Sequence, residues 1–164
     1  MKIRTATESD SEEIWKIFRA VVRPGDTYAL DPNISRADAL AYWSAAGTQT
    51  FVAEDESGGI VGTYILRPNQ QGPGAHVANA AFMVSPNAQG RGVGRVIGEH
   101  CLTRARELGF RAMQFNFVVS TNTAAVKLWQ QLGFEIVGRL PGAFNHPRDG
   151  YVDAYVMFRD FSAD

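Results

Sequence analysis

A loop at residues 85–94, SPNAQGRGVG, carries residue types that suit a phosphate group. Three glycines occur within five residues, with one arginine among them and another directly after: Gly90, Gly92, Gly94, Arg91 and Arg95. The apolar run AAFMV precedes the loop, and RVIGEHCLTRARELGF, with apolar residues at helical spacing, follows it. Unpaired N–H groups at a helix start, flexible glycines and two guanidinium groups together favour an anion. The same glycines could also serve only a turn and a close contact between helix and strand.

Two other phosphate-binding motifs do not fit this loop. No Gly-Lys-Ser or Gly-Lys-Thr follows the glycines, as a P-loop requires. Arg95 stands where the dinucleotide-binding fingerprint needs a small residue, and the loop lies in mid-chain after a predicted hairpin. The helix start and the arginines nonetheless favour a phosphorylated ligand.

The elements that would position this loop alternate along the chain. Apolar residues at helical spacing, with capping residues before and glycines after, predict helices at 7–22, 35–47, 91–109 and 121–133. Strand patterns occur at 2–6, 75–84, 111–119, 134–140 and 151–158, and a hairpin pattern at 48–68. Residues 23–34 and 140–150 are expected to be loops. This order predicts an α/β fold, a mixed sheet flanked by helices with one β-α-β crossover at its centre.

Composition restricts the class of protein. The 164 residues suit one domain, and the fractions of 45% hydrophobic and 20% charged residues are typical of a globular protein. A formal net charge of -1 gives no reason to expect nucleic acid or an anionic membrane as a partner. The one cysteine, Cys101, excludes an internal disulfide, and no Cys, His and Asp cluster indicates a metal site. Because the first residues lack an apolar signal region and no apolar stretch approaches about 18 residues, we expect a cytoplasmic location and no membrane segment.

Two motifs together resemble the GCN5-related N-acetyltransferase (GNAT) superfamily. The first, QGRGVG at 89–94, follows a predicted strand, and the second, NTAAVKLW at 122–129, is followed by LGF at 132–134. The resemblance covers essentially the whole chain. It implies a single N-acetyltransferase domain over residues 1–164, with about seven strands splayed at the centre of the sheet and four flanking helices. It also implies acetyl-CoA as the co-substrate.

By the same resemblance, residues that bind the cofactor can be named. The pyrophosphate would rest on the amides of Gly90–Arg95, the pantetheine arm would pair along the strand edge at Phe82–Val84, and the Val84 N–H would face the developing oxyanion. The set is Phe82, Met83, Val84, Gln89, Gly90, Arg91, Gly92, Val93, Gly94, Arg95 and Asn122. Asn122 is also the expected N-cap of the helix that follows it.

The chemistry that the resemblance implies is direct attack of a neutral amine on the thioester. This attack needs a donor for the oxyanion and a path for the amine proton. Many family members carry a tyrosine in the second motif that protonates the leaving thiolate. Trp129 occupies that position here, and an indole N–H is not a useful acid. A thiolate, whose free thiol has a pKa of about 8.5, is a fair leaving group without strong acid help.

Two asparagines, Asn79 and Asn116, interrupt the apolar patterns of the strands that would flank the thioester. Asparagine is a poor strand residue, and a buried amide needs partners. The two side chains therefore either bridge the strands structurally or bind the acceptor and order a catalytic water, because asparagine cannot serve as a formal base. We predict both as catalytic and substrate-binding residues.

The neighbouring strands, with PGAF and YVDAYVMFRDF, resemble the proline-analogue (azetidine-2-carboxylate) N-acetyltransferases, and GRLPGAFNH also resembles phosphinothricin-type acetyltransferases. Both imply that the acceptor is a small molecule whose amine accompanies a carboxylate, and we predict that Tyr28 and Tyr151 bind it. Arg23 and Arg148 are candidate carboxylate partners. His146 is expected in a surface loop, and a role as a proton carrier near neutral pH stays open as the alternative. A protein N-terminus or lysine as acceptor, and a CoA-binding module without turnover, stay open as alternatives. The resemblance to this family is also compatible with a homodimer.

Overall fold

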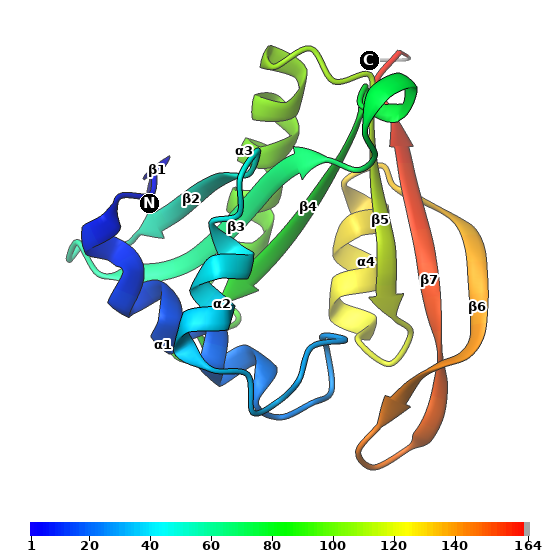
Figure 1. Cartoon of the computed structure of the whole chain (residues 1–164), viewed down its shortest axis with the longest axis horizontal. Coiled ribbons are helices and arrows are strands. Elements are labelled where there is room, and N and C mark those ends of the chain that lie inside the picture. Colours follow the sequence, from blue (N-terminus) through cyan, green and yellow to red (C-terminus); the bar gives the residue numbers. More distant parts are fainter. Residues whose placement is uncertain (163–164) are drawn as a thin grey trace.

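Residues 1–162, which the computed structural model describes, form one mixed sheet of seven strands in the order β1-β2-β3-β4-β5-β7-β6 (Figure 1). The strands are β1 Lys2–Thr5, β2 Gln49–Glu54, β3 Ile60–Pro68, β4 Val77–Val84, β5 Ala112–Val119, β6 Glu135–His146 and β7 Gly150–Asp160. The α-helices are α1 Ser11–Val22, α2 Arg36–Trp43, α3 Val93–Glu107 and α4 Thr123–Gln131. The predicted α/β class and the order of the elements are confirmed. None of these helices is long and apolar enough to span a membrane.

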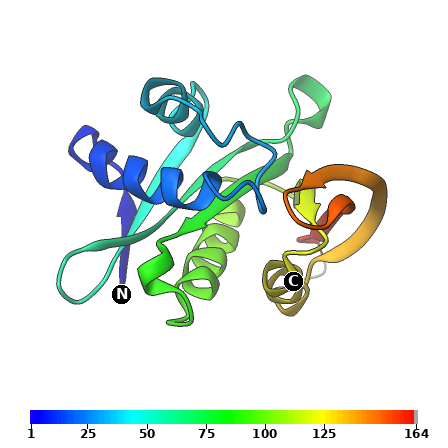
Figure 2. The ribbon, with the colours of Figure 1, turned by 90° about the horizontal axis from the view of Figure 1, so that it is seen from below.

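Helices cover both faces of the sheet (Figures 1 and 2). On one face, Phe18 of α1 and Trp43 of α2 share a buried cluster with Ile65 of β3 and Met83 of β4. On the other face, α3 and α4 share a buried cluster with Tyr64 of β3. Neighbouring strand residues point to opposite faces, which is why Tyr64 and Ile65 belong to different cores. We call the two sides the α1/α2 face and the α3/α4 face.

The central strands β4 and β5 are parallel but separate soon after they begin. Their pairing covers Val77 with Ala112 and Ala78 with Met113. Beyond these residues the two strands diverge toward the lower edge of Figure 1. The splayed sheet that the family resemblance implied is therefore present, and the loop between α1 and α2 lies near its open end (Figures 1 and 2).

The segment 140–150, expected to be a loop, instead forms the end of the β6 strand and its turn into β7. β6 continues to His146 and pairs with β7, although its register shifts between Leu140 and Phe144. β6 is the last strand of the sheet, so a proline within the shift, Pro141, interrupts the ladder only locally. Asp153 of β7 stabilises this shift, because its carboxylate accepts hydrogen bonds from the Gly142 N–H and the Arg139 Nη1, each at 2.9 Å. The Pro-Gly pair favoured a loop in the sequence, and that prediction was wrong.

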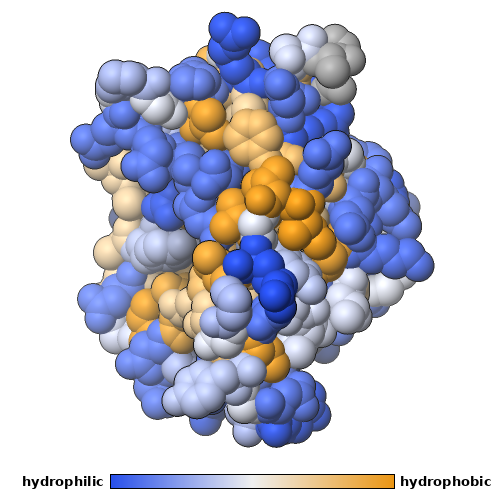
Figure 3. Space-filling model, turned by 90° about the vertical axis from the view of Figure 1, so that its right-hand side faces the viewer, coloured by the Kyte–Doolittle hydropathy of each residue, from blue (hydrophilic) through white to orange (hydrophobic). Residues whose placement is uncertain are grey.

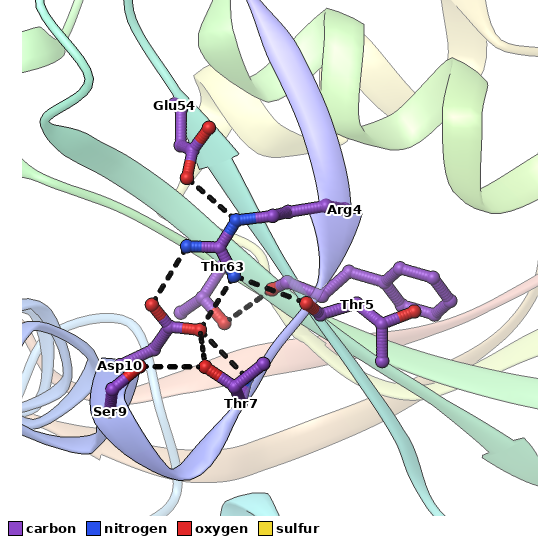
Figure 4. A network of polar contacts seen from close by, with 8 residues as sticks. Arg4, Thr5, Thr7, Ser9, Asp10, Glu54 and Thr63 are labelled. Atoms are coloured by element: carbon purple, nitrogen blue, oxygen red, sulfur yellow. Dashed lines mark hydrogen bonds and ion pairs between the residues drawn. The ribbon is translucent and has the colours of Figure 1, made fainter.

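The end of the sheet farthest from the splay is tied to α1 by one arginine (Figure 4). Arg4 of β1 donates to both carboxylate oxygens of Asp10, at 2.7 and 2.9 Å, and to Glu54 of β2 at 2.6 Å. Asp10 is 5% exposed, and it also accepts from the Thr7 N–H at 2.7 Å. The Arg4 hydrogen bonds hold the pKa of Asp10 well below its usual range. This network fixes the chain where it passes from β1 into the first helix.

Candidate active site

The loop between β4 and α3 requires glycine at two positions. Gly90 has a φ of +75°, and Gly92, the N-cap of α3, has a φ of +77°. A Cβ at either residue would meet no atom within 4 Å, so the backbone angle rather than lack of space excludes a side chain. Gly94 differs, because its Cβ would lie 3.4 Å from Leu128 Cδ2. Its small size therefore lets α3 approach α4, while the first two glycines shape the turn.

The first turn of α3 presents backbone N–H groups without helical partners. The Val96 N–H is the first to bond within the helix pattern, to Gly92 O at 3.1 Å, which leaves the N–H groups of Val93, Gly94 and Arg95 at the open end. No acidic residue lies in this turn. The helix dipole adds positive potential at the same place. This arrangement fits the pyrophosphate seat predicted for Gly90–Arg95.

Two arginines flank this seat, and each contacts a neighbouring side chain. Arg91 Nη2 lies 3.6 Å from Asp55 Oδ2, and Arg95 Nη1 lies 3.6 Å from Glu99 Oε1. Arg95 Nη2 also donates to Gln131 Oε1 at 2.5 Å. The arginines are 52% and 45% exposed, and ion pairs in such positions contribute only about 0–1 kcal/mol. A phosphate can therefore compete for both guanidinium groups.

The edge of β4 along the splay carries backbone groups that are not paired with another strand. Just past β4, the Ser85 N–H donates a hydrogen bond to Val61 O. Because every second residue of an antiparallel strand bonds to the same neighbour, the odd-numbered residues of β4 bond to β3. The backbone groups of Phe82 and Val84 therefore point toward the space that β5 has left. Met83, also predicted to bind the cofactor, turns its backbone to β3 and has a side chain in the core that is 1% exposed. Phe82 and Val84 form the edge along which an extended ligand can pair.

Tyr28, from the loop between α1 and α2, already bonds to this edge. Its hydroxyl donates to Phe82 O at 2.5 Å and accepts from the Phe82 N–H at 3.1 Å. Burial raises the pKa of the hydroxyl, and the nearby Tyr42 adds to the effect, so Tyr28 is neutral at physiological pH. The sequence predicted Tyr28 at the acceptor pocket, and the structure places it beside the splay.

Hydrogen bonds link four residues with amide side chains where β4 and β5 separate: Asn69, Asn79, Gln114 and Asn116. Asn79 Nδ2 donates to the backbone oxygen of Gln114 at 3.0 Å, where the interstrand ladder has ended. Gln114 Nε2 donates to Asn116 Oδ1 at 2.9 Å, and Asn116 Nδ2 donates to Asn69 Oδ1 at 2.7 Å. The structure therefore joins Asn79 and Asn116, the two predicted residues, through Gln114. We call these four side chains the amide cluster.

The two asparagines differ in what they can do within the amide cluster. Asn79 is half-buried and bridges the two strands, whereas Asn116 is exposed and bonds only to other side chains that can rotate. The sequence analysis missed Gln114 and Asn69. Gln114 lies two residues before Asn116, and strand alternation would have revealed it. Asn69 is 47 positions from Asn116, and no local pattern indicates that contact.

Helix α4 contributes two further residues from the sequence analysis. Trp129 is 8% exposed, and its ring centroid lies 4.7 Å from that of Phe82 and 4.9 Å from that of Phe115. It therefore forms an apolar wall on the α3/α4 face, against one residue from each diverging strand. Asn122 caps α4 by accepting the Ala125 N–H at 3.3 Å. This confirms the capping role, and contact with the cofactor stays a prediction.

Tyr151 and His146 lie on the β6–β7 hairpin, which projects at the bottom of Figure 1, whereas Arg23 directly follows α1. Tyr151 is 78% exposed. His146 is only 5% exposed, and its Nδ1 accepts the N–H groups of Arg148 and Asp149 in the hairpin turn. The expected surface position of His146 is therefore wrong. Within residues 1–162, no hydrogen bond links these side chains to the amide cluster, and no group of His, Cys, Asp or Glu could hold a metal ion.

The splay, the glycine loop and the capped α4 define a class of protein. The acetyltransferase (GNAT) family model matches residues 12–134. The chain belongs to this family, and it is an N-acetyltransferase that uses acetyl-CoA as co-substrate.

Individual relatives agree in fold and in general activity. A GCN5-related N-acetyltransferase structure from Kribbella flavida is 47% identical, with a TM-score of 0.93, and the match covers 97% of this chain and 96% of that one. N-acetyltransferase aca1 of Schizosaccharomyces pombe is 29% identical over 156 residues, 82% of this chain and 72% of its own length. L-amino acid N-acyltransferase MnaT of Escherichia coli is 28% identical over 145 residues, 86% of this chain and 83% of its own length. These similarities leave the acceptor to be identified.

Proposed function

We propose that this enzyme acetylates the amine of a small amino or imino acid by direct attack on acetyl-CoA. The observation that best supports this proposal is the position of the amide cluster beside the splay. The apolar wall at Trp129 lies on the other face, and the glycine loop follows at the end of the same strand, β4. MnaT is named for L-amino acids, and a relative from Salmonella typhimurium that is 26% identical is named for L-methionine sulfoximine and L-methionine sulfone. These names support an amino acid acceptor, and the proline-analogue type is our specific proposal.

The donor would lie along β4. The N–H groups of Gly90–Arg95 receive the pyrophosphate, the edge at Phe82 and Val84 receives the pantetheine arm, and Asn122 adds a polar contact beyond its cap. Val84 N–H donates to the oxyanion, because it points into the splay where the thioester carbonyl would be held. The co-substrate supplies an activated acetyl group and a thiolate leaving group.

The amide cluster orients the acceptor without taking its proton. Asn79 and Asn116 offer hydrogen-bond donors and acceptors, but an amide does not ionise near neutral pH. Because neither asparagine can act as a base, the amine must react in its neutral form, and an ordered water next to Asn116 carries the released proton away. Trp129 offers no acid, so the CoA sulfur leaves as the thiolate.

The first test measures release of the CoA thiol from acetyl-CoA. Azetidine-2-carboxylate, proline, methionine sulfone and a short peptide serve as acceptors. We expect turnover with the small acids and little with the peptide. If acetyl-CoA binds but only the peptide is acetylated, the enzyme modifies proteins, and this proposal fails.

The second test concerns Asn116. Asn116→Ala should lower kcat at least about tenfold, since orientation and proton release contribute about 10²–10⁴-fold in such sites. Its effect on stability should stay within about 0.5 kcal/mol, because the side chain is exposed. Asn145→Ala is the matched control, an exposed strand asparagine on β6. Equal losses of kcat and stability in the Asn116 variant would assign it to the sheet structure instead.

We further propose that two copies of the chain associate through β6. This strand ends the sheet, so one edge is unpaired, and Ile136, Val137 and Leu140 are 39%, 58% and 38% exposed along it. Figure 3 shows hydrophobic residues gathered on this side of the molecule. Light scattering should give twice the 18.0 kDa chain mass, and Val137→Lys should halve that mass. A wild-type monomer at micromolar concentration contradicts the proposal.

We also propose that the enzyme works in the cytoplasm. Its one cysteine, Cys101, is buried and unpaired, which suits a reducing compartment. Fractionation of cells that express the tagged protein should recover it with cytoplasmic markers, and recovery with secreted proteins would contradict this.

A further inference from the structure

Arg67 of β3 lies beside the amide cluster but was not found by sequence reasoning. It pairs directly with Asn79 of β4, so both side chains leave the sheet on the same face with Cβ atoms about 5 Å apart. Asn69 lies two residues further along the chain, just after the strand, and bonds to Asn116. Arg67 is therefore a near neighbour of two asparagines that bond to β5, Asn79 across the sheet and Asn69 along the chain.

A tyrosine from α2 holds the Arg67 guanidinium in place. Its Cζ atom lies 5.3 Å from the centre of the Tyr42 ring, and Nη2 donates a long hydrogen bond of 3.5 Å to the Tyr42 hydroxyl. Tyr28, which bonds to the edge of β4 at Phe82, packs against the same buried cluster as Tyr42. Arg67, Tyr42 and Tyr28 therefore lie on the α1/α2 face, from which Tyr28 reaches the strand edge at the splay.

Arg67 has no anionic partner within the described residues. Six other arginines form ion pairs with Asp or Glu side chains: Arg4, Arg36, Arg91, Arg95, Arg104 and Arg139. Arg67 is half-buried, yet no carboxylate of residues 1–162 lies within ion-pair distance of it. A partly desolvated guanidinium with donors free of a carboxylate favours an anion from outside the chain.

The position of Arg67 argues against the phosphates of the co-substrate as that anion. Asn79, its partner, precedes Val84 by five residues, or about 17 Å along an extended strand, and the glycine loop lies beyond Val84. Phe82 lies only three residues, or about 10 Å, from Asn79. A small acceptor that enters the splay between the amide cluster and the thioester lies nearer to Arg67 than the phosphates do, so its carboxylate is the anion that suits this guanidinium.

We propose that Arg67 binds the carboxylate of the acceptor, so that the enzyme selects α-amino or α-imino acids over amides, decarboxylated amines and peptide N-termini. The inference rests on the proposed function and specifies its substrate class. A guanidinium grips a carboxylate through two parallel hydrogen bonds, which fixes the direction of the acceptor as well as its charge. Arg23 and Arg148, the carboxylate partners suggested by the sequence, are not needed for this role.

The experiment compares azetidine-2-carboxylate with azetidine-2-carboxamide, and proline with prolinamide, in wild type, Arg67→Gln, Arg67→Lys and the control Arg36→Gln. For the acids, Arg67→Gln should lower kcat/KM about 10–100-fold, mostly through KM, because a charge-assisted hydrogen bond is lost. For the amides, kcat/KM should change less than about twofold. Arg67→Lys should recover part of the loss, since it restores charge without the paired geometry. Arg36→Gln should match wild type.

Three outcomes separate the hypotheses. Equal losses for acids and amides in Arg67→Gln, or a wild type indifferent to the carboxylate, overturn the role of Arg67 while the proposed function stands. Turnover of peptides alone overturns the proposed function, and the role of Arg67 falls with it. The melting temperature and the acetyl-CoA affinity of each variant should match those of the wild type. If a fall in either accounts for the whole loss of kcat/KM, the inference is also contradicted.

Discussion

Removal of the Tyr28 hydroxyl tests whether acetyl-CoA forms hydrogen bonds with the Phe82 backbone. In the free protein the hydroxyl makes two hydrogen bonds to the Phe82 backbone. Each is worth about 0.5–1.5 kcal/mol, so Tyr28→Phe should lower the free energy of unfolding by about 1–3 kcal/mol. In a domain of this size, this corresponds to a melting temperature about 2–12 °C lower.

The effect on acetyl-CoA affinity should have the opposite sign. A backbone N–H has one hydrogen to donate, so a pantetheine arm that pairs with the Phe82 N–H must displace Tyr28. The wild type then loses the Tyr28 bonds on binding, and the variant has none to lose. We expect Tyr28→Phe to bind acetyl-CoA more tightly, by about tenfold for each 1.4 kcal/mol of the lost stability.

Calorimetric titration with acetyl-CoA and thermal unfolding of the free protein measure both quantities. Tyr64→Phe is the matched control, because its buried hydroxyl bonds to His100 Nδ1 at 2.7 Å on the α3/α4 face. That variant should lose stability without a change in affinity. A Tyr28→Phe protein that is less stable but binds acetyl-CoA no more tightly would refute the argument. Phe82 would then be no part of the donor site, and Tyr28 would be a permanent brace of the strand edge.

Two further perturbations follow from the geometry. Gly90→Ala and Gly72→Ala both place a Cβ at positive φ with no atom within 4 Å, so each should cost about 1–2 kcal/mol of stability. Only Gly90→Ala should also weaken acetyl-CoA binding, because Gly90 belongs to the proposed phosphate seat. Equal acetyl-CoA affinities of the two variants would contradict that seat. Arg4 holds the pKa of Asp10 below its unfolded value of about 3.9, so this pair stabilises the fold above about pH 4 and that stability is lost as the pH falls. Asp10→Asn should therefore cost about 1–3 kcal/mol at pH 7 and flatten the fall in stability between about pH 4 and 2, measured by urea unfolding; an unchanged acid profile would contradict this.

The sequence by itself determined the parts that depend on neighbours along the chain. Gly90 and Gly92 are readable because a turn into a helix with positive φ needs glycine, and Asn122 because a helix start needs a cap. Helical and strand periodicity gave the order of elements. The ends were less certain: the helix predicted at 91–109 begins only at Val93, because the left-handed Gly92 cannot continue it backward.

Only the tertiary structure decided which side chains surround the splay, where we propose that the acceptor binds. Tyr28 bonds to Phe82 across 54 positions, and Asn116 meets Asn69 across 47. Arg67 faces Asn79 because of the register between β3 and β4. No local pattern encodes these contacts, since they follow from strand pairing and from where β4 and β5 part. The proposed donor site could therefore be predicted from the sequence, because its groups are consecutive backbone amides, while the proposed acceptor site depends on the folded sheet to bring distant side chains together.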